Sequence, residues 1–132
     1  MSTYNSKLVT ITVNGRFMTG FRDGDIYSYD EGDDRAIEYK GSDGTVDYSI
    51  KPTNECMITI GFKQSSPSLR YLHGLYDNQT PLSVTVMDSN PNGEKISGEN
   101  GVFQKRPVTT RSKEISEQEI VIMLPDHKYE KF

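Results

Sequence analysis

The chain has 132 residues, a length that suits one domain. Its formal net charge of −4 excludes the overall basic character typical of nucleic-acid-binding domains. The single cysteine, Cys56, excludes an internal disulfide, and no apolar run approaches membrane-spanning length. The low hydrophobic fraction of 33% fits a chain that completes its burial in an oligomer, and it also fits a loop-rich β domain.

The N-terminal third predicts a β-hairpin. Residues 8–13 alternate, with Val9, Ile11 and Val13 on one side of a strand. Asn14-Gly15 follows, and both residues tolerate the positive φ of a tight hairpin turn. The preceding "MSTYNSK" has no apolar signal core, so we expect synthesis and assembly in a cytoplasm.

Residues 22–47 carry nine acidic and three basic residues. We predict a strand at 26–31, a turn at 32–34, a partner strand at 35–40 and a further strand at 45–50. Alternation places the apolar side chains of these strands on one face and the acids on the other. The acidic candidates are Asp30, Glu31, Asp33, Asp34, Glu38 and Asp47.

The second half predicts further strands around one helix. Residues 56–62 have the apolar character of a central strand, and 81–87 and 117–124 are also predicted as strands. Ser66 and Pro67 favour a helix start, so we place a helix at about 67–77. Four residues form its apolar stripe: Leu69, Leu72, Leu75 and Tyr76.

Turn-rich or polar segments are the expected contacts with other subunits. These are the N-terminus, the loop around 89–101 and the tail after Pro125, which we expect to project. The turn-rich residues 88–103, which include this loop, fit either a long hairpin tip or a loop. The candidate interface residues are Thr3, Tyr4, Asn92, Gly93 and Tyr129.

Patterns of catalytic or metal chemistry are not found. The two histidines, His73 and His127, lie in unrelated places and form no zinc pattern with Cys56. No Gly-rich loop leads from a strand into a helix, and the acidic segment lacks the carboxylate spacing of a calcium loop. Paired carboxylates could serve a glycosidase, but no aromatic cleft accompanies them. We therefore predict no catalytic residue, no metal, no cofactor and no enzyme.

The stretch "ITIGFKQSSPSLRYLHGLYDNQTPLSVTVMDSNPNGEKISGENGVFQKRPV" resembles the tail tube proteins of contractile-tailed bacteriophages. The order of its turns and strands carries the resemblance, together with "GSDGTVDYSI" upstream. The matching positions are Lys63, Ser65, Pro67, Leu75, Tyr76, Asp88, Gly93, Gln104, Lys105 and Pro107.

This resemblance implies a mainly β fold, a β-sandwich or barrel of antiparallel strands with one flanking helix, related to the type VI secretion tube ring. It implies one domain over residues 1–132 with projecting N- and C-terminal segments. It further implies that six copies form a ring, that rings stack into a tube in the virion tail, and that sheath and baseplate proteins are partners. DNA would pass through without specific binding, and no membrane would be involved.

The acidic segment gains a role if four strands per copy join into one inner barrel of about 24 strands, roughly 48 Å across. An acidic lumen repels phosphates, so DNA can slide, and we predict that the polar face of residues 28–47 lines it. The alternatives are an acidic outer surface that keeps the protein soluble, a monomeric β-sandwich module with an acidic docking hairpin, and another tail component of the same fold.

Overall fold

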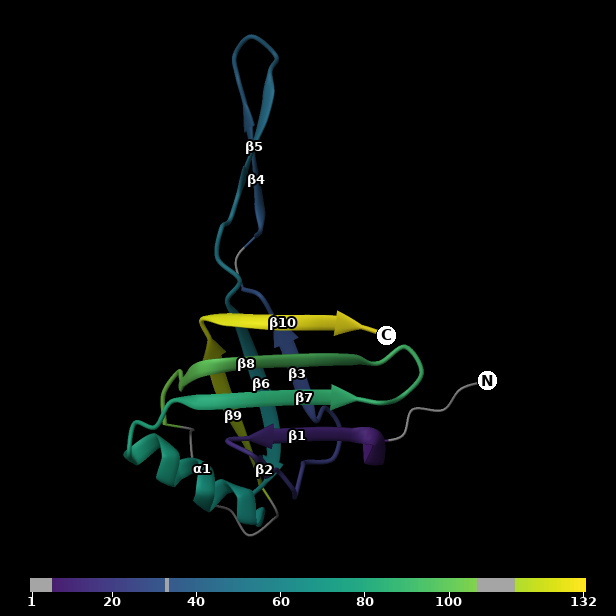
Figure 1. Ribbon diagram of the computed structural model, residues 1–132, viewed down its shortest axis with the longest axis vertical. Helices are drawn as coiled ribbons and strands as arrows, with labels where there is room; N and C mark the ends of the chain where they lie inside the picture. The colour runs from purple at the N-terminus through teal and green to yellow at the C-terminus, as the bar shows by residue number, and fades with distance from the viewer. Residues whose placement is uncertain (1–5, 33, 107–115) are drawn as a thin grey trace.

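Two antiparallel sheets form the body of the protein, and a two-stranded ribbon projects from it (Figure 1). The computed structural model describes residues 6–32, 34–106 and 116–132. The expected mainly β architecture with one helix is confirmed. Within those ranges the sheets stay open, so the fold is a sandwich and not a closed barrel.

The first sheet has the strand order β2-β1-β7-β8-β10. Its strands are β2 (Arg16–Phe17), β1 (Val9–Val13), β7 (Leu82–Asp88), β8 (Glu94–Phe103) and β10 (Asp126–Lys131). A short 3-10 helix (Ser6–Leu8) precedes β1. Asn14 and Gly15 turn from β1 into β2 with φ of 52° and 81°, which confirms the predicted tight turn.

The second sheet lies behind the first and crosses it (Figure 1). It consists of β9 (Glu117–Leu124), β6 (Cys56–Lys63) and β3 (Tyr27–Asp30), joined to the end of β8. β8 changes sheet near Asn100, which has a φ of 60°, and Gly101. A Cβ on Gly101 would lie 2.7 Å from Leu124 Cδ2, so glycine permits the close approach of β8 to β9.

Alternating side chains from both sheets meet in one apolar core. In β1 the residues at 9, 11 and 13 are buried, whereas Thr10 and Thr12 are half-exposed. β7 and β9 alternate in the same way, so each sheet has one apolar and one polar face. Fully enclosed members of this core include Ile58, Ile60, Phe62, Leu82, Ile96, Ile120 and Ile122.

The helix α1 (Pro67–Asp77) begins and ends where the sequence predicts, at the end of the sandwich opposite the ribbon (Figure 1). Ser66 Oγ accepts a hydrogen bond of 3.3 Å from the Ser68 N–H, and a proline occupies the first helical position. At the other end the Asn78 N–H donates to the Gly74 carbonyl at 3.1 Å.

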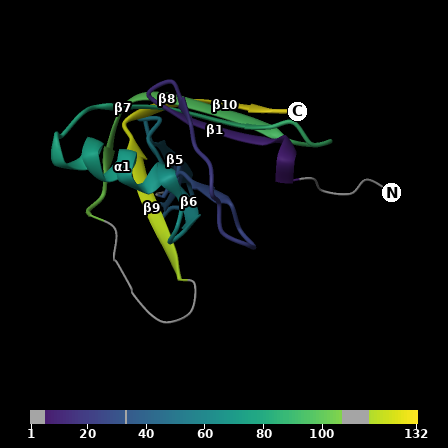
Figure 2. The same cartoon turned by 90° about the horizontal axis from the view of Figure 1, so that it is seen from below.

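The predicted apolar stripe of α1 faces the sandwich. Leu69 and Leu72 are buried, and Leu75 packs half-buried against the core. Tyr76 lies edge-on to Phe103, with 5.9 Å between ring centroids. Figure 2 shows the helix lying against the layered strands, with the first sheet as a layer above it.

The predicted pairing of residues 26–31 with 35–40 is wrong. β3 pairs with β6, with Tyr29 opposite Ile58. β4 (Ala36–Lys40) pairs instead with β5 (Val46–Ile50) across the turn at 41–44, and these two strands make the ribbon. The pairing with β6 half-buries Tyr29 against the core, a gain that the exposed β4 could not supply.

Two segments expected as loops are strands. The C-terminal segment after Pro125 does not project, because residues 126–131 form β10 and pair with β8 along their whole length. Of the two expectations for residues 88–103, the hairpin agrees better with the structure, because β8 begins at Glu94 and pairs with β7. His127 is the one buried residue of β10, so this strand lacks the apolar alternation that would have revealed it.

Candidate assembly surfaces

The ribbon of β4 and β5 is the most exposed element of the described chain. All ten of its strand residues are exposed, and its two strands pair only with each other among the described elements. A two-stranded hairpin is marginally stable by itself in water, so this ribbon lacks the support that a core gives. Its exposed large apolar side chains are Ile37, Tyr39, Val46, Tyr48 and Ile50, with exposed fractions between 46% and 68%.

The turn at the tip of the ribbon uses one of the acids locally. Asp43 Oδ1 accepts hydrogen bonds from the Thr45 N–H at 3.1 Å and from Thr45 Oγ1 at 2.8 Å. These bonds hold the pKa of Asp43 below its usual value. Gly44 has a φ of 89°, which a residue with a side chain rarely adopts. The negative charge at the tip therefore serves the turn.

The acids of the ribbon do not share one face. Residues directly opposite each other in an antiparallel pair lie on the same face, and Glu38 is opposite Tyr48 whereas Asp47 is opposite Tyr39. Glu38 and Asp47 therefore lie on opposite faces, each beside an apolar side chain. The expectation that the apolar residues and the acids of these strands separate onto two faces is wrong for this pair.

The remaining acidic candidates lie near the base of the ribbon. Asp30 is exposed on the outward face of the second sheet, opposite Met57, and its carboxylate accepts a hydrogen bond from the Gly32 N–H at 2.8 Å. Glu31 pairs with Arg35 at 3.1 Å, and this hydrogen bond holds the pKa of Glu31 below its usual value. Asp34 is exposed, and Asp33 lies outside the described residues. The structure therefore gathers these candidates into no single surface.

The outward face of the first sheet is a polar surface that the sequence analysis did not single out. Its residues alternate with the buried ones and align across the strands, so that Thr12, Thr85, Ser97 and Lys128 form one row. The other members are Thr10, Ser83, Met87, Lys95, Glu99, Asp126 and Glu130. Five of these residues are serine or threonine and five are charged, and two lysines against three carboxylates leave a formal charge of −1. The Ser/Thr residues that alternate with apolar ones in 8–13 and 82–88 were the available signal.

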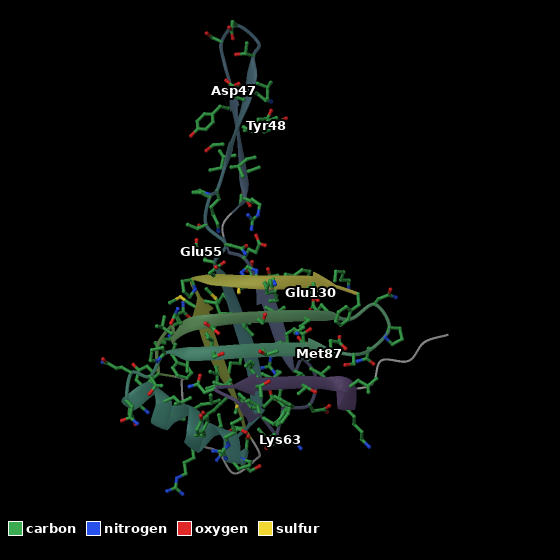
Figure 3. All side chains as sticks on the ribbon, in the orientation of Figure 1. Asp47, Tyr48, Glu55, Lys63, Met87 and Glu130 are labelled. Atoms are coloured by element: carbon green, nitrogen blue, oxygen red, sulfur yellow. The ribbon has the colours of Figure 1, made fainter. Side chains whose placement is uncertain are left out.

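A shallow hollow of about 500 Å³ opens on this outward face, lined in part by Ser83, Thr85 and Ser97. Figure 3 shows Met87 and Glu130 on the sheet, whereas Asp47 and Tyr48 lie on the ribbon well clear of it. The polar sheet face and the acidic ribbon are therefore two separate surfaces.

The described interface candidates are held within the chain. Asn92 accepts a hydrogen bond from Lys131 Nζ through its carbonyl, and the Gly93 carbonyl accepts one of 2.9 Å from the Phe132 N–H. Tyr129 stacks on Tyr29 and donates to Glu94. Their role between subunits stays a prediction. Thr3 and Tyr4 lie outside the described residues.

Two sheet edges that are largely unpaired among the described residues are the other features suited to assembly. Along β10 one edge pairs with β8, and the other bears a single bridge, between Asp126 and Asn54. At the far edge of the first sheet, the two-residue β2 covers only the end of β1. Unpaired strand edges are ready to pair with another chain.

Other classes of site leave little trace. No helix of residues 6–32, 34–106 and 116–132 has the length and apolar character needed to cross a membrane. The same residues contain no group of three or more His, Cys, Asp or Glu that could hold a metal ion. His73 contacts Gln118 at 3.4 Å and Arg106 at 2.9 Å beside the helix.

The fold is similar to that of chains in solved assemblies of contractile systems. The fold is similar to a chain of the anti-feeding prophage cap, the AFP tube terminating cap, with a TM-score of 0.60 at 13% identity, covering 100% of this chain and 93% of that one. It is also similar to a chain of the sheath–tube complex of an extracellular contractile injection system, PVC, in its extended state (TM-score 0.57, 16% identity, 98% and 93% covered). A chain of the PVC sheath/tube terminator gives a TM-score of 0.53 at 14% identity, with 98% of each chain covered.

The family follows from the sequence. Residues 1–126 match the family described as the bacteriophage PhiTE tail tube protein, so the chain belongs to that family of structural tail proteins. Among curated proteins no sequence match was found. The resemblance to phage tail tube proteins is thereby confirmed.

Proposed function

We propose that this protein is the repeating subunit of a phage tail tube in which six copies form a ring and rings stack. Family membership and the similarity to tube components of contractile systems support the class. The first sheet supplies four long strands, β1, β7, β8 and β10, the number expected per copy for an inner barrel. Pairing the β10 edge of one copy with the β1 edge of the next would continue the sheet around a ring.

The exposed ribbon carries this proposal. It presents five large apolar side chains to solvent on an element that has no core of its own. Exposed apolar surface of this kind marks an interaction site. In our proposal the ribbon reaches a copy in the adjacent ring and is stabilised there, so burial of Tyr48 and Ile50 accompanies stacking. The sheath and the baseplate are the further partners, and assembly takes place in the host cytoplasm.

For the passage of DNA, we propose that the outward face of the first sheet lines the lumen. Its charge of −1 and its hydroxyl groups offer no surplus of cations that would neutralise phosphates and hold the duplex. Asp30 lies across the core on the outward face of the second sheet, so it cannot share this wall. The acidic ribbon then acts through its charge near the ring junctions, and not as a continuous lumen lining.

The first test is assembly of the purified protein, followed by light scattering and negative-stain microscopy. We expect rings or tubes well above the monomer mass of 14.9 kDa. The double variant Tyr48→Ser/Ile50→Ser should keep the circular dichroism of the native sandwich but fail to form tubes. Met87→Ser is the control, because it removes exposed apolar surface from the proposed lumen wall and should leave tube formation intact. If the double variant still forms tubes, the ribbon is not needed for stacking. A native protein that stays strictly monomeric would contradict the proposed function.

A charge-matched pair of variants identifies the lumen wall. One variant adds three positive charges to the sheet face: Ser83→Lys, Thr85→Lys and Ser97→Lys. The other neutralises three acids: Asp30→Asn, Glu38→Gln and Asp47→Asn. Each changes the formal charge from −4 to −1 per copy. If the sheet face lines the lumen, only the lysine variant should slow DNA release, and salt should restore the rate. Slowing by the neutralised variant alone would favour the acidic lumen predicted from the sequence.

A further inference from the structure

Two segments join the ribbon to the sandwich: the first leg runs from β3 to β4, and the returning leg runs from β5 to β6. Together these two segments are called the root of the ribbon. A closed ring of hydrogen bonds connects both of them to β10. In the first leg, Glu31 Oε2 accepts a hydrogen bond of 3.1 Å from Arg35 Nη2. The same nitrogen donates to Asn54 Oδ1 at 3.0 Å in the returning leg. The Asn54 side-chain amide donates to the His127 carbonyl at 2.5 Å. Tyr29 closes the ring, with its hydroxyl 2.5 Å from His127 Nε2 and 3.3 Å from Glu31 Oε1.

The direction of the hydrogen bonds in this ring depends on one proton. His127 Nδ1 lies 2.6 Å from the Asn54 carbonyl, which can only accept, so Nδ1 carries a hydrogen. In the neutral imidazole, Nε2 is then an acceptor and takes the single hydrogen of the Tyr29 hydroxyl. Glu31 Oε1 receives no hydrogen from Tyr29 in that state, which agrees with the longer distance of 3.3 Å.

A protonated imidazole reverses this arrangement. Nε2 then donates to the Tyr29 oxygen, and the hydroxyl hydrogen is free to point to Glu31. Burial raises the pKa of Tyr29, so its hydroxyl keeps the hydrogen in both states. The hydrogen bond from Arg35 lowers the pKa of Glu31, so its carboxylate stays charged in mild acid. Tyr29 and Glu31 therefore keep these forms whether the His127 ring is neutral or protonated.

Several charged and titratable groups surround His127. Its side chain is buried, and its ring meets the Tyr29 ring edge-on at 5.3 Å. Burial raises the pKa of the Cys56 thiol to about 11, so that group stays neutral. The titratable and charged groups around His127 are Tyr29 of β3, Glu31 and Arg35 of the first leg, Cys56 of β6, Glu94 and Glu99 of β8, and Asp126, Lys128 and Tyr129 of β10.

We propose that the protonation state of His127 controls how firmly the root of the ribbon is held to the sandwich. We call this arrangement the latch. In the neutral state the chain of donors stops at His127, and Glu31 is held by Arg35 alone. In the protonated state an unbroken chain runs from the Asn54 carbonyl through His127 and Tyr29 to Glu31. Hydrogen bonds that involve charged groups are the stronger ones, so mild acid tightens the root. This latch belongs to the single chain and does not depend on the proposed ring or tube.

Hydrogen exchange on the monomer, followed by NMR between pH 5 and 8, tests the latch. The Lys51 N–H donates to the Arg35 carbonyl at 2.6 Å and reports on the root. The Gly41 N–H, which donates to the Thr45 carbonyl at 2.8 Å, is the control at the tip of the same ribbon. After correction for intrinsic exchange, the protection of Lys51 relative to Gly41 should rise by about threefold or more from pH 8 to pH 5. Its midpoint should coincide with that of the His127 ring nitrogens.

Tyr29→Phe keeps the stacked ring but removes the hydroxyl, and it should abolish the pH dependence of the Lys51 to Gly41 ratio. Tyr48→Phe, on the exposed ribbon, is the matched control and should leave it unchanged. An equal response in Tyr29→Phe and the native protein would overturn the proposal. So would a His127 ring that stays in one state across this range. A root that loosens in acid would also overturn the proposal, because burial of the charged imidazole would then outweigh the new hydrogen bonds.

Discussion

Shortening Leu72 to alanine tests how the helix is held to the sandwich. Leu72 lies in the middle of α1 and is 1% exposed, so its side chain is enclosed between the helix and the core. The substitution removes three buried carbon atoms and leaves a space that the neighbouring strands can fill only in part. We expect the free energy of unfolding to fall by about 2–5 kcal/mol, the range measured for leucine in closed cores.

Leu75 is the matched control, because it lies one turn further along the same helix but is only half-buried. Leu75→Ala has the same effect on helix propensity and removes the same atoms. The Leu75 side chain buries less apolar surface on folding, so Leu75→Ala should lower the free energy of unfolding by less, about 1 kcal/mol. The difference between the two variants isolates burial from propensity.

Urea denaturation of the monomer, at protein concentrations below those that form tubes, gives both free energies. The slope of the free energy of unfolding against urea concentration should be the same for the native protein and both variants if the sandwich unfolds in one step. A change below about 0.5 kcal/mol for Leu72→Ala would mean that this side chain is not enclosed in the free chain. The helix would then serve contacts between subunits, and the interpretation that it packs on the sandwich through Leu72 would be wrong.

Further predictions concern assembly and close packing. Deleting residues 1–6 should impair tube formation more than monomer stability, and normal tubes from the shortened protein would argue strongly against a role of this segment between subunits. Gly61→Ala should lower the free energy of unfolding by about 1–2 kcal/mol, because a Cβ would lie 2.1 Å from Arg22 Nε and would displace this side chain from the Asp25 carbonyl and from Glu119. Gly74→Ala, with open space around the added carbon, should instead raise it by about 0.5–1 kcal/mol. Thermal denaturation of the pair measures both, and equal losses would refute the packing argument.

Local signals in the sequence predicted most of the elements. The helix is confirmed at 67–77 because a capping serine, a first-turn proline and an apolar stripe all agree there. The strands at 56–63 and 117–124 are apolar enough to be recognised, and they pair with each other in the centre of the second sheet. These elements owe their identity to residues close in sequence, so no knowledge of the tertiary fold was needed.

Pairing partners and polar edge strands were not predictable in the same way. Two turn signals, at 32–34 and 41–44, both indicate a hairpin, and only the second one joins paired strands. The pairing partner of β3 is determined by burial against β6, about thirty residues away in the sequence. A local pattern does not contain this information. β10 contains a single buried residue, because one of its faces and one of its edges are open.

The distribution of the acids follows from the open state of the ribbon. An exposed two-stranded element with five large apolar side chains is a hazard in a free subunit, because it can pair with any other strand edge. Charges placed between apolar residues oppose such contacts, because a charged side chain would have to lose its water there. Asp47 supplies such a charge on one face of the ribbon, and Glu38 with Lys40 supplies charges of both signs on the other. A single acidic face would have left the other face unprotected. The register therefore places charged residues on both faces of an exposed element that, in our proposal, is buried only when rings stack.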